Sequence, residues 1–229
     1  MKLKIFFLAV FFTPALLNAQ RLDRFAMSKF AAGGERGIAY PMQKSFFGIL
    51  PTDSIRNYIK SDTTFYYIYL WLPKPVKELG VQLISPVPRY TSAWKGDYEA
   101  PDYHDSLKAD GKYFDPVLMV RLLPNSELRK ETFWNNIPPP PPPPSEPLRS
   151  NDNSDEAPVQ PSLKKNNSLI RIGASETDTA YAAAGLYLIL FKSATNKKPE
   201  GTFVIQVGAT EVTPGLKLFR RTDELTESY

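Results

Sequence analysis

The chain has 229 residues, with 28 lysines and arginines against 24 aspartates and glutamates, one histidine and no cysteine. The absence of cysteine excludes disulfides, thiolate metal sites, cysteine nucleophiles and attachment of lipid to a cysteine. The formal net charge is +4 and falls to +2 without Lys2 and Lys4, so nucleic-acid binding is not predicted.

The first 19 residues predict a secretory signal peptide. Lys2 and Lys4 precede an apolar run over residues 5–17, and the small Ala19 offers a cleavage site. The alternative is a membrane anchor, but a helix needs about 20 apolar residues to cross a bilayer. We therefore expect an exported chain that begins at Gln20, carries no lipid or transmembrane anchor, and forms one domain over residues 20–229.

Residues 20–36 lack periodicity and predict a loosely held lead-in to the domain. Beyond them, short runs rich in β-branched and aromatic residues predict strands at 64–72, 81–84, 117–123, 185–191 and 202–207. Residues 45–50 form a short apolar segment, and ordered structure is expected to return at 168–172. Helical turns are predicted at 75–79, because Pro75 stands near the start and Gly80 follows, and at 127–134. The stretch 85–112 is rich in proline and glycine and predicts a loop.

A proline-rich excursion is predicted over residues 135–166. Seven consecutive prolines, 138–144, favour an extended polyproline conformation that cannot join a sheet ladder. A polar stretch follows to Gln160 and has little apolar area to bury. Too little chain follows for a second domain, so we expect a mobile excursion that the core does not need.

Many short strands with Pro- and Gly-rich connections predict a mainly β protein, a sandwich or a barrel. In the aromatic strand at 64–72, Phe65, Tyr67, Tyr69 and Trp71 share one face, and the residues between them share the other. These rings could form a ligand-binding face. Core packing is the favoured interpretation, because sandwich interiors use such residues routinely.

The sequence gives little support for a catalytic site. His104 is the single histidine and lies in a polar loop, which favours a solvated side chain over a general base. No Gly-x-Ser-x-Gly elbow or phosphate-binding glycine loop is present. The acidic stretch 152–156 offers the oxygen ligands that calcium prefers, although such loops are more often simply solvated.

Four segments, in order and with similar spacing, resemble the leptospiral major surface lipoprotein family over about residues 45–210. They are Phe65 to Pro73 continuing through Glu78 to Pro86, Phe114-Asp115 leading into Val120-Arg121, Asn167 to Ile172, and Gly185 to Tyr187 with Gly201 to Val204 and Val207-Gly208. The resemblance implies a jelly-roll-like antiparallel β-sandwich with a few short peripheral helices.

The resemblance also implies a calcium site. In the family, the ligands come from an Asp-Thr pair, an acidic run and a backbone carbonyl just before Asn-Ser-Leu. The matching residues are Asp115, Asp152, Asn153, Asp155, Glu156 and the carbonyl of Asn166. Pro116 replaces the family's threonine and the run is less acidic than the family's, so we expect weak calcium binding.

Two functions remain open on the sequence. The first is an exported, non-enzymatic binding or envelope structural protein, which is periplasmic, cell-surface-associated or secreted. Its partner would be a protein or polysaccharide, and the resemblance implies partners like those of the extracellular matrix. The alternative is a carbohydrate-active jelly-roll hydrolase, which would need two carboxylates about 5–10 Å apart in a groove.

Overall fold

The computed structural model describes residues 40, 42–123, 149–151, 159–164, 167–173, 181–195, 197–221 and 224. Its elements are β1 (Met42–Leu50), β2 (Arg56–Lys60), β3 (Thr63–Leu72), β4 (Leu79–Ile84), β5 (Tyr98–Glu99), the 3₁₀ helix η1 (Asp105–Asp110), β6 (Pro116–Leu122), β7 (Arg149–Asn151), β8 (Ser168–Ile172), β9 (Gly185–Ser193), β10 (Gly201–Ala209) and β11 (Lys217–Phe219). No helix among these residues has the length and apolar character needed to cross a membrane.

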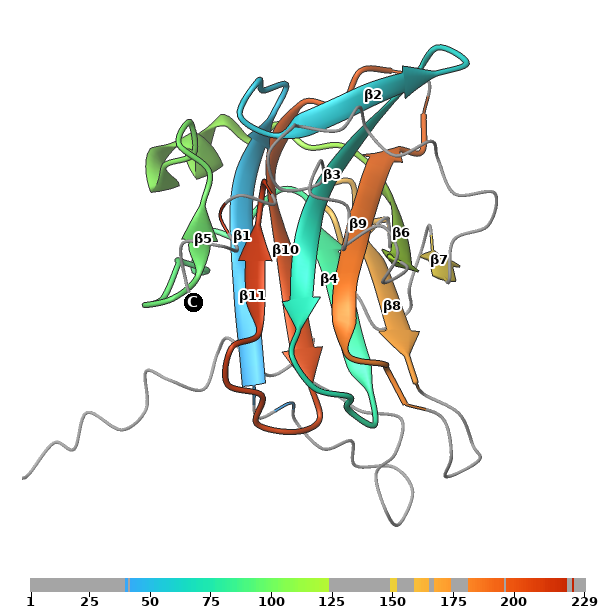
Figure 1. Cartoon of the computed structure of the whole chain (residues 1–229). Coiled ribbons are helices and arrows are strands. Elements are labelled where there is room, and N and C mark those ends of the chain that lie inside the picture. Colours follow the sequence, from blue (N-terminus) through green and yellow to red (C-terminus); the bar gives the residue numbers. More distant parts are fainter. Residues whose placement is uncertain are drawn as a thin grey trace, which may run out of the picture.

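The strands form two sheets that face each other (Figure 1). One has the order β5-β1-β10-β4-β8, and the other has the order β11-β3-β9-β6-β7 with β2 added beside β3. Among the strands described, every pair is antiparallel except β1 with β5. The prediction of a mainly β, antiparallel sandwich is thus confirmed, whereas a jelly-roll connectivity stays a prediction.

Strand β3 is buried on both faces. Tyr66, Ile68 and Leu70 belong to the main core together with residues of the opposite sheet such as Val81 and Val207. The alternate residues Tyr67 and Tyr69 join a second apolar cluster with Leu186, Leu188, Leu190, Phe219 and Leu123. Side chains alternate across a strand, so the second cluster lies on the opposite face of this sheet. Core packing is therefore confirmed for these tyrosines.

The segment after β4 packs against the edge of the first sheet. The ring centroids of Phe47 and Tyr103 are 5.5 Å apart, and Val87 and Ala100 belong to the same apolar core. Helix η1 is held nearby because Lys108 Nζ donates to the carbonyl of Thr91 at 2.5 Å. The predicted loop at 85–112 therefore contains β5 and a short helix, and its apolar residues fix its path.

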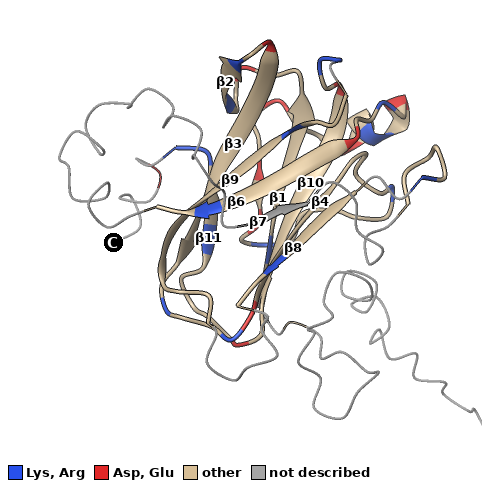
Figure 2. Ribbon diagram, turned by 90° about the vertical axis from the view of Figure 1, so that its right-hand side faces the viewer, with Lys and Arg blue, Asp and Glu red and all other residues tan. Residues whose placement is uncertain are grey.

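All five predicted strands are confirmed, as β3, β4, β6, β9 and β10, with small differences at their ends, and the segments at 45–50 and 168–172 form β1 and β8. Strands β2, β5, β7 and β11 were not predicted, because their short sequences, RNYIK, YE, RSN and KLF, contain no long apolar run. Such short strands exist because a neighbour offers an edge: β2 and β11, for example, both pair with β3. Figure 2 shows charged residues gathered mainly on loops and strand ends, with few on the central strands.

One local prediction is wrong. Residues 75–79 are not helical, because Val76 exchanges backbone hydrogen bonds of 3.0 and 2.8 Å with Ala182 and Leu79 already begins β4. Within the predicted excursion at 135–166, β7 pairs with β6 and the side chain of Gln160 is buried, while the mobility of the excursion stays a prediction. The signal peptide at 1–19, the lead-in at 20–36, the helix at 127–134 and the proline run at 138–144 lie outside the described residues.

Candidate functional site

Asp115 is the only predicted calcium ligand among the described residues, and it directly precedes β6. Its carbonyl accepts a 2.7 Å hydrogen bond from the amide of Ala194, and its carboxylate atom Oδ1 is buried. The other five, Asp152, Asn153, Asp155, Glu156 and Asn166, lie outside that part of the chain. Within the described ranges, no group of three or more His, Cys, Asp or Glu residues is placed to hold a metal ion.

The residues that flank the predicted ligands do meet in one buried network. Gln160, which follows the acidic run, donates through Nε2 to the carbonyls of Phe114 at 2.5 Å and Ser85 at 3.0 Å. Asn167 accepts a 3.0 Å hydrogen bond from the amide of Ser85, and Ser168 donates to the carbonyl of Pro116 at 2.6 Å. The described residues that flank the proposed ligands, at 114–116, 160 and 167–168, are therefore held together by this network.

His104 lies on the surface just before η1, where its Nδ1 atom hydrogen bonds with the Ser106 hydroxyl. Of the carboxylates nearby, Asp105 is committed to Lys108, with an Nζ–Oδ1 distance of 2.6 Å. This ion pair, together with hydrogen bonds from Ser92 and Tyr103, holds the pKa of Asp105 below its ordinary value despite the opposing effect of burial. Both side chains are exposed and lie two residues apart in the same turn, so the position of His104 fits the solvated loop side chain expected from the sequence.

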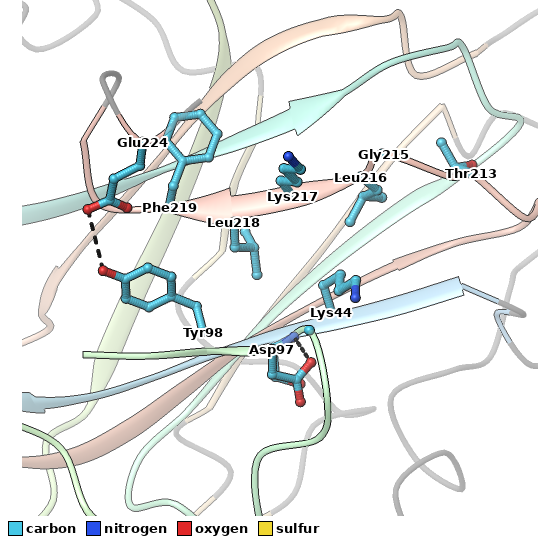
Figure 3. A pocket seen from close by; sticks show the side chains of 12 residues that line it. Lys44, Asp97, Tyr98, Thr213, Gly215, Leu216, Lys217, Leu218, Phe219 and Glu224 are labelled. Atoms are coloured by element: carbon cyan, nitrogen blue, oxygen red, sulfur yellow. Dashed lines mark hydrogen bonds between the residues drawn. The ribbon is translucent and has the colours of Figure 1, made fainter. Parts of the chain in front are cut away.

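A groove of about 460 Å³ opens at one edge of the sandwich, between β1 and β5 of one sheet and β11 of the other (Figure 3). We call it the edge groove. Its apolar lining includes Leu216, Leu218 and Phe219, which are buried members of the two apolar clusters. Its volume falls within the range of small-ligand sites, roughly 300–1,000 Å³.

Both acidic residues of the edge groove carry structural hydrogen bonds. Asp97 accepts from the amides of Ser45 and Trp94, both at 2.9 Å, and thereby fixes the turn that leads into β5. Glu224 accepts from the amide of Arg220 at 3.1 Å, and its other carboxylate oxygen lies 3.3 Å from the Arg220 guanidinium. These contacts commit the two acids to holding the rim of the groove.

Arg220 contacts Tyr98, which lines the groove. Its guanidinium carbon lies 5.6 Å from the centre of the Tyr98 ring, and its Nε atom donates to the Tyr98 hydroxyl. The Tyr98 ring also stacks on Phe46 with a centroid distance of 4.8 Å. Burial, reinforced by Glu224, raises the pKa of Tyr98 above its ordinary value, so this hydroxyl stays neutral at physiological pH.

The edge groove also carries two lysines whose charge is not neutralised locally. Neither Lys44 nor Lys217 forms an ion pair with any residue that the structure describes. The Lys44 ammonium passes over Gly96, where an added Cβ would lie only 2.5 Å from Nζ. A side chain at that position would displace the ammonium, so glycine leaves room for it.

The sequence did not reveal the edge groove. Its residues come from three segments, near positions 44, 97 and 217, and none of them forms a motif with the others. One local signal was available: Asp97 follows Gly96 by one residue and precedes the short β5, an arrangement typical of a hydrogen-bonded turn. This local signal predicts only a turn. The turn lies opposite β11 because the two sheets pack against each other.

A family model described as a surface lipoprotein of the order Spirochaetales, Lipl32, matches residues 35–218, which is most of the chain. A search of curated proteins gave no significant match. The matched range contains all four segments on which the resemblance rested and almost every strand of the sandwich. The chain therefore belongs to the Lipl32 family of spirochaetal surface lipoproteins.

Proposed function

We propose that this protein is an exported, non-enzymatic envelope protein that binds a protein or polysaccharide partner, including partners like those of the extracellular matrix. Membership of a surface lipoprotein family is the observation that carries the proposal. The open edge groove, with apolar walls and locally unneutralised lysines, supports a binding role. Fold by itself does not decide function, so the proposal rests on this site and on the family.

The alternative of a glycan hydrolase requires one carboxylate that donates a proton and a second that acts as a base or nucleophile. Asp97 and Glu224 are the acids of the edge groove, and both accept hydrogen bonds from backbone amides. Asp97 fixes the turn before β5 and Glu224 also pairs with Arg220, so both carboxylates serve structural roles at the rim of the groove. Binding is therefore favoured over hydrolysis at this groove.

We also propose a weak calcium site built by Asp115, by Asp152 and Asn153 or Asp155 and Glu156, and by the carbonyl of Asn166. Asp115 precedes β6 and is held by the sheet, and the flanking residues Gln160 and Ser168 donate hydrogen bonds to the carbonyls on either side of it, those of Phe114 and Pro116. Ordering the acidic run costs about 1–2 kcal/mol per residue, which weakens the site. A dissociation constant on the order of 0.1–1 mM is expected.

A thermal unfolding experiment tests the calcium proposal. A ligand that binds the native state alone raises the melting temperature, so millimolar calcium should raise it more than equal magnesium. Asp115→Ala should remove the difference between the two ions. Asp110→Ala, a change at an exposed aspartate of η1, is the matched control and should keep it. If calcium and magnesium act alike on the unaltered protein, the calcium proposal is wrong.

Cell fractionation tests location and lipid attachment together. The family is one of lipoproteins, whereas this chain contains no cysteine to carry a lipid. We expect the processed protein in the envelope or outside the cell, and we expect it to partition into the aqueous phase of a detergent extraction. Partition into the detergent phase, with a mass increase that matches an acyl chain, would show a lipid attached by another route.

A further inference from the structure

We propose that the edge groove is a docking site for an extended, acidic segment of a partner protein, which adds as a strand to β11. The inference rests on the proposed binding function and goes further by naming the surface and the chemistry of the partner. Three observations carry it: the unpaired edge of β11, the apolar lining beneath that edge, and the two lysines.

Strand β11 is the last strand of its sheet, and β3 is its one strand partner among the described residues. Its outer edge therefore faces the groove without a neighbouring strand. The corresponding stretch of β1 is closed, because the amide of Ser45 is already bonded to Asp97 and β5 pairs with Phe46 and Phe47. An extended chain that enters the groove finds a free strand edge at β11, a common mode of peptide recognition.

The two faces of β11 differ in chemistry. Leu218 points into the groove towards β1, whereas Lys217 projects from the opposite side of the strand (Figure 3). An added strand presents its side chains alternately to these two faces. Apolar residues would therefore pack beside Leu216 and Leu218, and the residues between them would lie beside the Lys217 ammonium. This arrangement selects a segment in which apolar and acidic residues alternate.

The charge of the groove selects acidic residues over basic ones. Asp97 and Glu224 are committed to backbone amides and to Arg220, while Lys44 and Lys217 form no ion pair with described residues. Lysine on an edge strand also discourages self-association of identical edges, because like charges repel. An acidic strand from a partner is attracted by the same lysines. Lys44 and Lys217 therefore oppose self-association and favour an acidic partner.

A polysaccharide is a less suitable occupant of this groove. Sugar rings bind by stacking on exposed aromatic faces, and the Tyr98 ring already stacks on Phe46 while its hydroxyl accepts a hydrogen bond from Arg220. The Phe219 ring stacks on Tyr69. The groove thus offers apolar side chains and a backbone edge, which suit a peptide.

The test measures fluorescence anisotropy of a labelled, end-blocked heptapeptide in which glutamate and valine alternate, with purified full-length protein. We expect saturable binding that weakens markedly in about 0.5 M salt, since exposed charge pairs are screened. Lys44→Ala and Lys217→Ala should each weaken binding roughly two- to fivefold, and the double change to glutamate by about tenfold or more. Lys197→Glu, at an exposed lysine that does not line the groove, should have little effect.

Two further probes decide the mode of binding. The same heptapeptide with alternate backbone amides methylated cannot form the strand ladder and should not bind. Hydrogen exchange at residues 217–219 should slow when the unmodified peptide is present. Equal binding of the methylated peptide, tighter binding of a lysine-valine peptide, or binding of heparin oligosaccharides alone would each overturn the inference. Because the peptide test uses purified protein, its failure leaves the predictions on envelope location and calcium standing.

Discussion

The guanidinium atom Nη1 of Arg171 lies 2.9 Å from Glu78 Oε1, and both side chains are almost wholly buried. The Tyr40 hydroxyl joins them, since it donates to Glu78 and accepts from Arg171. Burial raises the pKa of the Tyr40 hydroxyl well above its ordinary value, so it stays protonated. This cluster ties Tyr40, two residues before β1, to the start of β4 and to β8.

Replacing one member of that ion pair should be far more harmful than replacing both. Arg171→Met leaves the Glu78 carboxylate buried without its guanidinium, and should lower the free energy of unfolding by about 3–5 kcal/mol. Glu78→Leu combined with Arg171→Met should recover much of the loss, because neither charge is then buried. Urea unfolding measures both variants. Lys112→Met, which removes an exposed pair with Glu200, is the control and should change little.

Gln82→Met should stabilise the protein. Gln82 is fully buried on β4, and neither its Nε2 nor its Oε1 atom has a hydrogen-bond partner among the described residues. A buried amide without partners costs about 1–3 kcal/mol, and methionine fills a similar volume without that penalty. We expect a gain of about 1–2 kcal/mol in the free energy of unfolding by urea titration. A loss of stability would mean that ordered water satisfies the amide.

Gly201 is predicted to be intolerant of any side chain. Its φ is +124°, and an added Cβ would lie 2.2 Å from the carbonyl oxygen of Lys112. Gly201→Ala should therefore lower the free energy of unfolding by about 3 kcal/mol or more, from backbone strain and a forced shift. Gly111→Ala is the matched control: its φ is +65° but nothing lies within 4 Å, so only about 1 kcal/mol is expected. Equal thermal destabilisation by the two changes would refute the steric argument.

Tyr187 should make stability depend on alkaline pH. Its hydroxyl donates to the Ala183 carbonyl at 2.6 Å, and burial raises its pKa to about 12. Because the folded pKa exceeds the unfolded value of about 10, the contribution is complete below pH 10 and is lost as pH rises towards 12. Tyr187→Phe should be less stable than the unaltered protein at neutral pH. The difference in free energy of unfolding between the two proteins should narrow as the pH rises from about 10 to about 12. Urea midpoints across that range measure it, and a gap independent of pH would contradict the assignment.

Local patterns determined much of the fold. The aromatic, β-branched run that became β3 and the apolar runs of β9 and β10 predicted strands because their side chains suit a pleated, buried surface. The same residues carried the resemblance that the family model confirmed. Signal cleavage and calcium ligation, including the role of Asp115, stay predictions from the sequence.

Tertiary structure alone decided the remaining features. Residues 75–79 were predicted to form a helical turn, but the pairing of Val76 with Ala182 over a long sequence separation supplies hydrogen bonds that a single turn cannot match. The short β11 exists because β3 offers it an edge, and the edge groove exists because two sheets leave Lys44 opposite β11. These relationships depend on contacts between residues far apart in the chain, which no local window of sequence contains.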